Sequence, residues 1–353
     1  MSRTILYVGT GRGVFKAEGN GHGYAIEPLG LHDSGGLRCP VIVDIHDPRR
    51  LYAGTSSRGV TVSEDGGAAW REINHGLDKQ EVWWLEQHPR TGELWAGVSP
   101  TAMYKSADRG ESWTECRQLQ SLPTIPEWSF PQPPHISHVK HISLRPDDPS
   151  QVLGAVEEGW LIRSVDGGET WENLRNGCEF DAHTVYFMPD NPRVVLSTSG
   201  QGFYRSEDGG DSFVRIRGGL DRRYMAQLAI HPSRPQTMFT AAAEVPPPGW
   251  TRPEGANSAF YRSDDQGRTW RQLHGGLPDH IKPAPRCVAG DPDDPDGVFF
   301  GLTDGSVWLT RNGGESFERI LDVPLPPEAS DTSAVHVRND PRFNAVTSIR
   351  VAH

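Results

Sequence analysis

Short runs of alternating apolar and polar residues fill the chain, and Gly, Pro, Asp and Asn separate the runs. One example, which begins at Val139, is VKHISLRPDDPSQVLGAVEEGWLIRSVDGGETWENL. Its first run alternates as a half-buried strand does, a Pro-containing turn follows, and three more strand-like runs come after the turn. The pattern predicts a four-stranded antiparallel unit. Because the sequence contains no run with the apolar period of an amphipathic helix, the predicted fold class is all-β.

The same unit recurs around a short motif, S-x-D-x-G-x-[ST]-[WF]. Its copies, some of them decayed, are SEDGGAAW from Ser63, SADRGESW from Ser106, SVDGGETW from Ser164, SEDGGDSF from Ser206, SDDQGRTW from Ser263 and TRNGGESF from Thr310. The first turn of each unit contains a proline, at Pro48, Pro89, Pro146, Pro189, Pro232 and Pro292. A four-stranded unit repeated at this spacing is typical of the blades of a β-propeller, so the repeats predict six complete blades.

The two ends of the chain supply a seventh blade. The N-terminal run ILYVGTGRGVFKAE resembles LYAGTSSRGVTVSE of the first complete blade, so it is predicted to form a second and third strand. The C-terminal run VTSIRVAH, from Val346, matches the first strand that begins at Val139. Pairing the two ends would close the ring and remove exposed sheet edges. We therefore expect one seven-bladed propeller domain over residues 1–353, with a closing blade from residues 1–34 and 344–353.

The acidic residues of the motif are predicted to be structural. An Asp in a turn can accept hydrogen bonds from backbone N–H groups two residues further on, the Gly permits a positive φ, and the aromatic residue can pack on a neighbouring sheet. The carboxylates form a series that resembles a catalytic set, but the turn explains them better. This structural role is assigned to Asp65, Asp108, Asp166, Asp208 and Asp265.

With these motifs the chain resembles the BNR/Asp-box repeat propellers, which include sialidases, sortilin-type receptors, xyloglucanases and the photosystem II assembly factor. The resemblance covers the whole chain and implies the fold, whereas these relatives differ in chemistry. Sialidases carry an N-terminal Arg-Ile-Pro-type motif that this sequence lacks, which argues against sialidase activity. Xyloglucanases pair two propellers, and this chain has the length of one. The assembly factor is similar in size, but its export and its arginine-rich patch are not evident here.

Three insertions interrupt the repeat, at residues 117–137, 245–259 and 322–343. By the blade alignment all three join strands or blades on one face, which we call the top face, opposite the Asp boxes. Long loops on one face of a compact repeat fold favour a functional role, so the insertions are predicted to act as lids. Trp128, Phe130 and Trp250 would supply apolar anchors for the first two.

Candidate functional residues gather where the inner strands reach the top face, because polar residues replace the repeat consensus there. The acid, base or catalytic candidates are Lys140, His141, Asp181, His183 and Glu158. The candidates for ligand binding are Arg286, Trp83, Glu81, Tyr224, Arg58 and Gln201. A divalent metal held by His138, His141 and His183, with carboxylates from Asp181 and Glu158, is an alternative. Imidazole and carboxylate are common metal ligands, although the spacing matches no known motif. We expect Lys140, His141, Asp181 and His183, with Glu158 and Arg286, to line one pocket under the first two insertions.

Charge and cysteine content limit the partners. The formal net charge is −11 and the isoelectric point about 5.7, which argues against nucleic acids and anionic membranes because both select clustered Lys and Arg. The four cysteines are far apart in the sequence, and the N-terminus lacks the pattern of a secretion signal, so a cytoplasmic location is expected.

Two functional hypotheses remain open. The first is a propeller that binds a small polar molecule, a carbohydrate or a carboxylate, in the funnel along its axis, with hydrolase or lyase activity included. The second is a scaffold without catalysis that binds a protein partner or assists assembly. The sequence does not identify the substrate or any cofactor.

Overall fold

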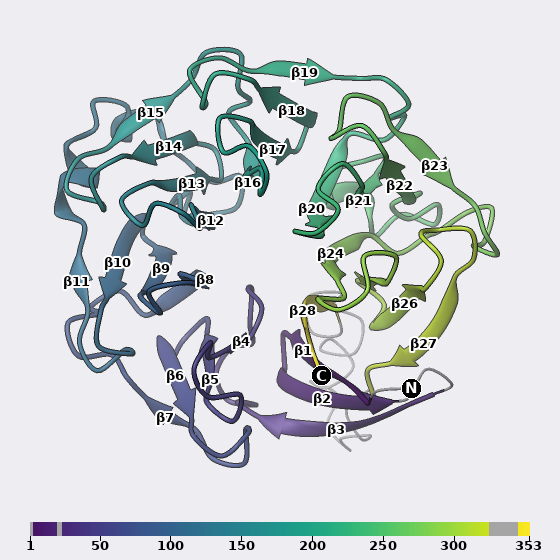
Figure 1. Cartoon of the computed structure of the whole chain (residues 1–353), viewed down its shortest axis with the longest axis horizontal. Helices are drawn as coiled ribbons and strands as arrows, with labels where there is room; N and C mark the ends of the chain where they lie inside the picture. The colour runs from purple at the N-terminus through teal and green to yellow at the C-terminus, as the bar shows by residue number, and fades with distance from the viewer. Residues whose placement is uncertain (1–2, 20–22, 325–344) are drawn as a thin grey trace.

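The computed structural model describes residues 3–19, 23–324 and 345–353. Within these ranges the strands form seven four-stranded antiparallel sheets arranged as a ring (Figure 1). The first strand of each sheet lies nearest the centre of the ring and the fourth lies at its rim. The predicted seven-bladed propeller is therefore confirmed.

The blades are numbered from the one that holds both ends of the chain, and their strands are given from the centre outward. Blade 1 contains β28 (Val346–Ala352), β1 (Thr4–Thr10), β2 (Gly13–Gly19) and β3 (Tyr24–Gly30). Blade 2 contains β4 (Ile42–Val43), β5 (Leu51–Gly54), β6 (Val60–Ser63) and β7 (Arg71–Glu72). Blade 3 contains β8 (Glu81–Gln87), β9 (Leu94–Ser99), β10 (Ala102–Ser106) and β11 (Thr114–Glu115).

The other four blades follow the same order. Blade 4 contains β12 (Val139–Leu144), β13 (Val152–Val156), β14 (Trp160–Ser164) and β15 (Glu172–Leu174). Blade 5 contains β16 (Ala182–Phe187), β17 (Val195–Ser199), β18 (Gly202–Ser206) and β19 (Val214–Ile216). Blade 6 contains β20 (Tyr224–Ile230), β21 (Met238–Ala243), β22 (Ala259–Ser263) and β23 (Arg271–Leu273). Blade 7 contains β24 (Pro285–Gly290), β25 (Val298–Leu302), β26 (Ser306–Thr310) and β27 (Glu318–Asp322).

Blade 1 closes the ring as the sequence predicted. β28 pairs antiparallel with β1, with Val351 opposite Leu6 and Ile349 opposite Val8. These four side chains are buried in an apolar cluster that also contains residues of blade 7. The observed strand, Val346–Ala352, lies within the C-terminal run VTSIRVAH that the sequence assigned to it.

Short 3-10 turns are the helical elements in the described ranges, and they lie in the first two insertions. They are η1 (Arg117–Ser121), η2 (Ile125–Glu127) and η3 (Pro247–Gly249). None of the helices in the described residues has the length and apolar character needed to cross a bilayer.

Each Asp box is a closed set of hydrogen bonds, shown here for the copy in blade 4. Ser164 Oγ donates to Asp166 at 2.9 Å and accepts from the backbone N–H of Gly168 at 2.8 Å. Asp166 also accepts from the backbone N–H and the hydroxyl of Thr170, at 2.9 and 2.6 Å. The bonded N–H therefore lies four residues after the Asp and not two, because Gly168, at φ +89°, turns the chain back toward the carboxylate. These hydrogen bonds lower the pKa of Asp166 to about 2.

A second repeated contact joins each of blades 3 to 6 to the next blade. The Lys or Arg directly before the Ser of the box donates to the backbone carbonyl of the fourth box residue in the following blade. We call these contacts blade latches, and they are Lys105 to Gly167 (2.8 Å), Arg163 to Gly209 (2.7 Å), Arg205 to Gln266 (2.7 Å) and Arg262 to Gly313 (2.8 Å). Blade 2 has Val62 at this position, and Arg50 donates to the carbonyl of Arg109 at 3.3 Å instead.

Replacing Asp208 with Ala should lower the free energy of unfolding by about 1 to 2 kcal/mol, the usual cost of losing a side-chain cap on backbone donors. Asp208 accepts from Ser206, from the backbone N–H of Ser212 and from its hydroxyl. Urea denaturation would measure the change.

Asp208→Asn is the matched control, because Asn312 fills the same position in the decayed copy. There the Asn312 oxygen accepts from the backbone N–H of Ser316 at 2.9 Å, and its amide group donates to the Ser316 hydroxyl at 2.8 Å. The Asn variant should lose much less stability than the Ala variant. Equal losses would show that the carboxylate position is not a cap.

Candidate functional site

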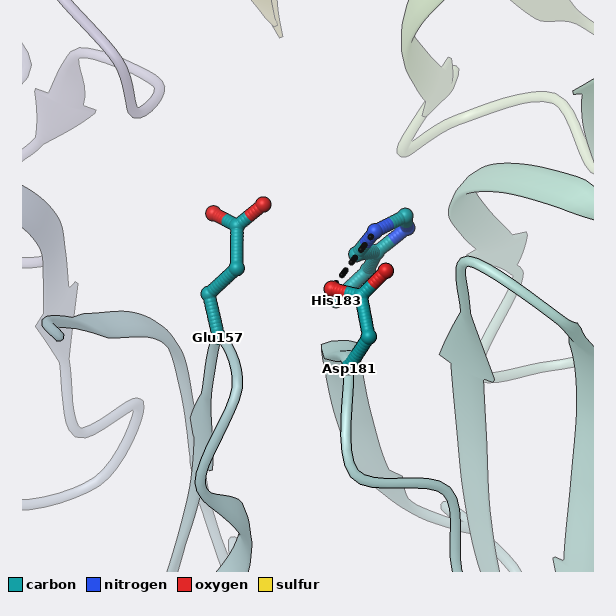
Figure 2. A group of neighbouring side chains, drawn as sticks. All are labelled: Glu157, Asp181 and His183. Carbon is teal, nitrogen blue, oxygen red and sulfur yellow. Dashed lines mark ion pairs between the residues drawn. The ribbon is translucent and has the colours of Figure 1, made fainter. Parts of the chain in front are cut away.

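A cluster of ionisable side chains lies at the top-face ends of the first two strands of blade 4 and of the first strand of blade 5. Glu157 directly follows β13, Asp181 directly precedes β16, and His183 is the second residue of β16. One ligand atom from each of the three lies within 4.8 Å of those of the other two. Figure 2 shows that the three side chains come from neighbouring strands and point to the same side.

Glu157 is the buried centre of this cluster, with a side chain that is only 8% exposed. Its Oε2 accepts from His138 Nε2 at 2.8 Å, and its Oε1 accepts from Lys140 Nζ at 2.7 Å. Burial would raise the pKa of Glu157, but the charge of Lys140 and the hydrogen bond from His138 hold it well below its ordinary value. Burial lowers the pKa of His138, which favours the neutral ring. Glu157 is therefore an ionised carboxylate held by two donors.

His183 and Asp181 face each other beside Glu157. His183 Nδ1 is 2.8 Å from the carbonyl oxygen of Met225, and its Nε2 is 3.4 Å from Asp181 Oδ1. Neither Nε2 nor Oδ1 has a hydrogen-bond partner among the described residues. Burial would raise the pKa of Asp181, but His183 and Lys140 lower it below the ordinary value.

β-Bulges place several of these side chains. In β12 the register shifts between Val139 and His141, so Lys140 is the extra residue, and in β16 the shift makes His183 the extra residue. The same position is bulged in β8, at Trp83, and in β24, at Arg286. A bulge redirects the side chain of its extra residue, so Lys140 and His183 do not follow the regular alternation of their strands.

Aromatic residues surround the cluster on the blade 3 side. Trp83 stacks on His138, with ring centroids 3.2 Å apart and planes 15° apart. Phe130, from the first insertion, meets both rings edge-on, and the guanidinium of Arg38 lies 3.9 Å from the Trp83 centroid. The indole N–H of Trp83 donates to Glu81 at 3.1 Å.

The second insertion supplies the aromatic wall on the other side. Tyr224 meets His183 edge-on at 4.6 Å, and Trp250 meets Tyr224 at 5.5 Å. The exposed guanidinium of Arg286 lies 6.0 Å from the Trp250 ring. We call the surface formed by Lys140, Glu157, Asp181, His183 and Tyr224 the axial mouth. Residues 325–343 of the third insertion lie outside the described residues, so its predicted role as a lid stays a prediction.

Several predicted site residues do not join the axial mouth. His141 is buried between blades, 4.1 Å from the Trp84 ring and 4.7 Å from the Tyr186 ring, and burial lowers its pKa to about 3. The expectation that it would line the pocket is therefore wrong, because next to the bulge at Lys140 it packs between Trp84 of blade 3 and Tyr186 of blade 5. Arg58 instead forms ion pairs with Asp33 and Glu72 of blade 2 and its entry loop.

Two further candidates lie beside the cluster and not within it. Glu158 occupies the turn after Glu157 at φ +51°, and burial and Asp181 raise its pKa. The backbone N–H of Gln201 donates to Ser199 Oγ in the β17–β18 turn. The predicted metal set also changes, because His138 is committed to Glu157 and His141 lies elsewhere. Among the residues that the structure describes, the group with the required proximity is Glu157, Asp181 and His183.

From the sequence, both Glu157 and Glu158 were expected at the top-face rim, but only Glu158 was chosen as a catalytic candidate. Aligned by strand pairing, Glu157 follows Val156 as Gly200 follows Ser199 in the next blade. A Cβ at position 200 would lie 2.0 Å from Asp181 Oδ2, so the glycine leaves the space that Asp181 fills. The exchange of Glu for Gly between adjacent blades is the sequence signal for this cluster.

A separate cavity of about 830 Å³ lies beside the outer strands of blade 3. Its lining includes Lys105, Glu115 and Glu169. Lys105 pairs with Glu169 at 3.0 Å, and Glu115 pairs with Lys79 at 2.9 Å.

Comparisons of sequence and of structure find propellers of different function. The family model for sortilin, neurotensin receptor 3, matches residues 159–277. The photosystem II assembly lipoprotein Ycf48 of Synechococcus sp. (strain CC9902) is 21% identical over 280 residues, which are 79% of this chain and 74% of that protein. The oligoxyloglucan-reducing end-specific xyloglucanase of Emericella nidulans is 36% identical over 70 residues, which are 18% of this chain and 8% of that protein.

The solved structures that superpose on this chain also come from proteins of different function. An ancestral GH74 enzyme superposes with a TM-score of 0.62 at 19% identity, over 80% of this chain but only 38% of the enzyme. A structure of YCF48 bound to D1 peptide superposes with a TM-score of 0.56 at 16% identity, over 91% of this chain and 90% of that one. At these identities the similarity establishes the fold and not the chemistry. With relatives among the sortilin, GH74 and Ycf48 proteins, the seven-bladed chain is consistent with the BNR/Asp-box family of propellers.

Proposed function

We propose that the chain binds a hydroxyl-rich polar ligand of the carbohydrate class at the axial mouth. The observation that carries this proposal is the pair of polar atoms without a hydrogen-bond partner, Asp181 Oδ1 and His183 Nε2, between aromatic walls. Polar groups in such a place normally have partners, so an unsatisfied pair marks a position that a ligand can satisfy.

The surroundings suit a sugar. Phe130, Tyr224 and Trp250 are half-buried beside the mouth, and Trp83, also half-buried, packs against His138 and Arg38. Apolar ring surface packs against the C–H face of a sugar, while its hydroxyls donate to carboxylate oxygens. The exposed guanidinium of Arg286 adds a partner for a carboxylate, as in a uronic acid.

Asp181→Asn should weaken saccharide binding roughly ten- to a hundredfold, the scale of one hydrogen bond to a charged group. Saturation-transfer NMR against a panel of neutral and uronic oligosaccharides would identify the ligand, and calorimetry would measure its affinity. Arg58→Gln is the matched control, because its ion pairs lie outside the mouth. Failure of the whole panel to bind, or equal effects of the two variants, would contradict the proposal.

A second candidate is a scaffold that binds an extended peptide. The similarity to Ycf48 spans most of both chains, and one similar structure is that of YCF48 bound to D1 peptide. A peptide library, with that D1 peptide included, separates the two candidates. Micromolar peptide binding without saccharide binding would favour the scaffold.

Hydrolase or lyase turnover and a cytoplasmic location are further parts of the proposal. The four free cysteines, Cys39, Cys116, Cys178 and Cys287, support a reducing compartment. Product analysis of any bound oligosaccharide would test turnover, and cell fractionation would test location.

A further inference from the structure

The contact between His183 and Asp181 brings together a ring nitrogen and a carboxylate oxygen, neither of which has a hydrogen-bond partner among the described residues. The carbonyl oxygen of Met225 can only accept, so His183 Nδ1 carries the proton of their 2.8 Å hydrogen bond. In the neutral ring Nε2 then presents a lone pair, and it faces Asp181 Oδ1 at 3.4 Å. The side chain of His183 is only 5% exposed, so water does not surround this nitrogen. A cation between the two groups, whether a proton on Nε2 or a metal ion, would make the contact favourable.

Glu157 completes a set of three ligands. One ligand atom from each of Glu157, Asp181 and His183 lies within 4.8 Å of the others, and Figure 2 shows the three side chains directed to the same side. Two carboxylates and one imidazole are donors that divalent first-row transition metals accept. We propose that Glu157, Asp181 and His183 bind a divalent first-row transition metal ion, such as zinc, at the axial mouth.

The residues behind these ligands fix them as metal sites require. Ligating histidines usually donate their other ring N–H to a carbonyl or carboxylate, as His183 does to Met225. Glu157 is oriented by the hydrogen bond from His138 at 2.8 Å. The backbone N–H of Gly200 donates to the Asp181 carbonyl oxygen at 3.2 Å, and the absent Cβ at this position leaves room for the carboxylate.

Lys140 is the competing cation. Its ammonium group is 2.7 Å from Glu157 Oε1, and its side chain is 24% exposed. A metal ion would take over the charge that Lys140 neutralises, and the lysine can turn outward into solvent. Lys140→Met should therefore tighten metal binding by about tenfold, because it removes a like charge next to the ion. A purely structural role of the three ligands predicts no such gain.

Titration of the chelator-treated full-length chain with Zn²⁺, followed by calorimetry, tests the site. Co²⁺ absorption provides a second readout that does not depend on any ligand or activity. One site per chain is expected, with affinity lowered about a hundredfold or more in His183→Gln and in Asp181→Asn, since each loses a direct ligand. His353→Gln is the matched control, because His353 forms a separate pair with Asp291 at 2.7 Å on the surface.

The outcomes are distinct. Full-strength binding in both His183→Gln and Asp181→Asn, or loss of binding in His353→Gln, would overturn the proposal, as would wild-type protein that binds neither ion below ~0.1 mM. If His183→Gln failed to fold, Asp181→Asn would decide, because Asp181 is 28% exposed and its loss leaves the strand intact. The metal titration contains no saccharide, so its result stands whether or not a carbohydrate binds.

Discussion

Deleting residues 346–353 should abolish soluble, monodisperse protein. The deletion removes β28, whose Val346, Ile349 and Val351 are all at most 7% exposed. Each buried side chain of this kind contributes about 1.5 to 3 kcal/mol, so together they approach the whole stability of an ordinary domain. The loss also exposes the edge of β1 in blade 1, and exposed strand edges promote aggregation.

Size-exclusion chromatography and thermal melting of the truncated chain would measure this effect. A chain that lacks only His353 is the control, because that residue contributes a surface ion pair, worth about 0 to 1 kcal/mol. If the truncated chain eluted as a monomer and melted at the wild-type temperature, the strand would not be needed for closure.

Asp44→Ala should lower the free energy of unfolding by about 3 kcal/mol, because it leaves several buried donors without an acceptor. The side chain of Asp44 is fully buried. It accepts from Tyr52 of its own blade, from Gln87 of blade 3 at 3.0 Å, and from Arg109 in the Asp box of blade 3 at 3.1 Å. One carboxylate thus joins two blades.

Urea denaturation would measure the loss, with Asp47→Ala as the control. Asp47 is 40% exposed and is the acceptor for the backbone N–H of Arg49, so its replacement should cost less than about 1 kcal/mol. Equal effects of the two variants would contradict the role of Asp44 between the blades.

The contribution of Asp44 should also depend on pH. Burial would raise its pKa, but hydrogen bonds from Gln87, His46 and Tyr52 and the charge of Arg109 lower it below the ordinary value. The stabilisation is therefore fully present above the unfolded pKa of about 3.9, and it disappears as the pH falls through the lower folded value. Wild type and Asp44→Ala should converge in stability in acid, as denaturation curves at several pH values would show.

The fold could be predicted because its signals are local and repeated. Each Asp box is a few residues long and appears six times, so a single decayed copy such as that at Thr310 does not hide the pattern. The closing strand was found because Val346, Ile349 and Val351 repeat the apolar positions of β12. The pairing of β28 with β1 then follows, because it buries the apolar side chains of both strands.

The site was harder to predict because bulges change which side chains face the axis. A regular strand would direct Lys140 and His141 to opposite faces, and the sequence alone does not say which of them faces the centre. The bulge at Lys140 leaves His141 between blades. Glu157 and Glu158 are adjacent in the sequence, and only the turn at Glu158 decides which one reaches His138.

The blade latches bear on how such a ring can change in evolution. From blade 3 to blade 7 every junction uses the same residue position on one side and the same backbone carbonyl on the other. A gene duplication that copied one interior blade would therefore supply two parts of the ring. The copy would carry a side chain that donates to the next blade and a backbone carbonyl that accepts from the preceding blade. Blade 1 is different, because it depends on the pairing of two chain ends, and it is the one unit that such a duplication could not supply.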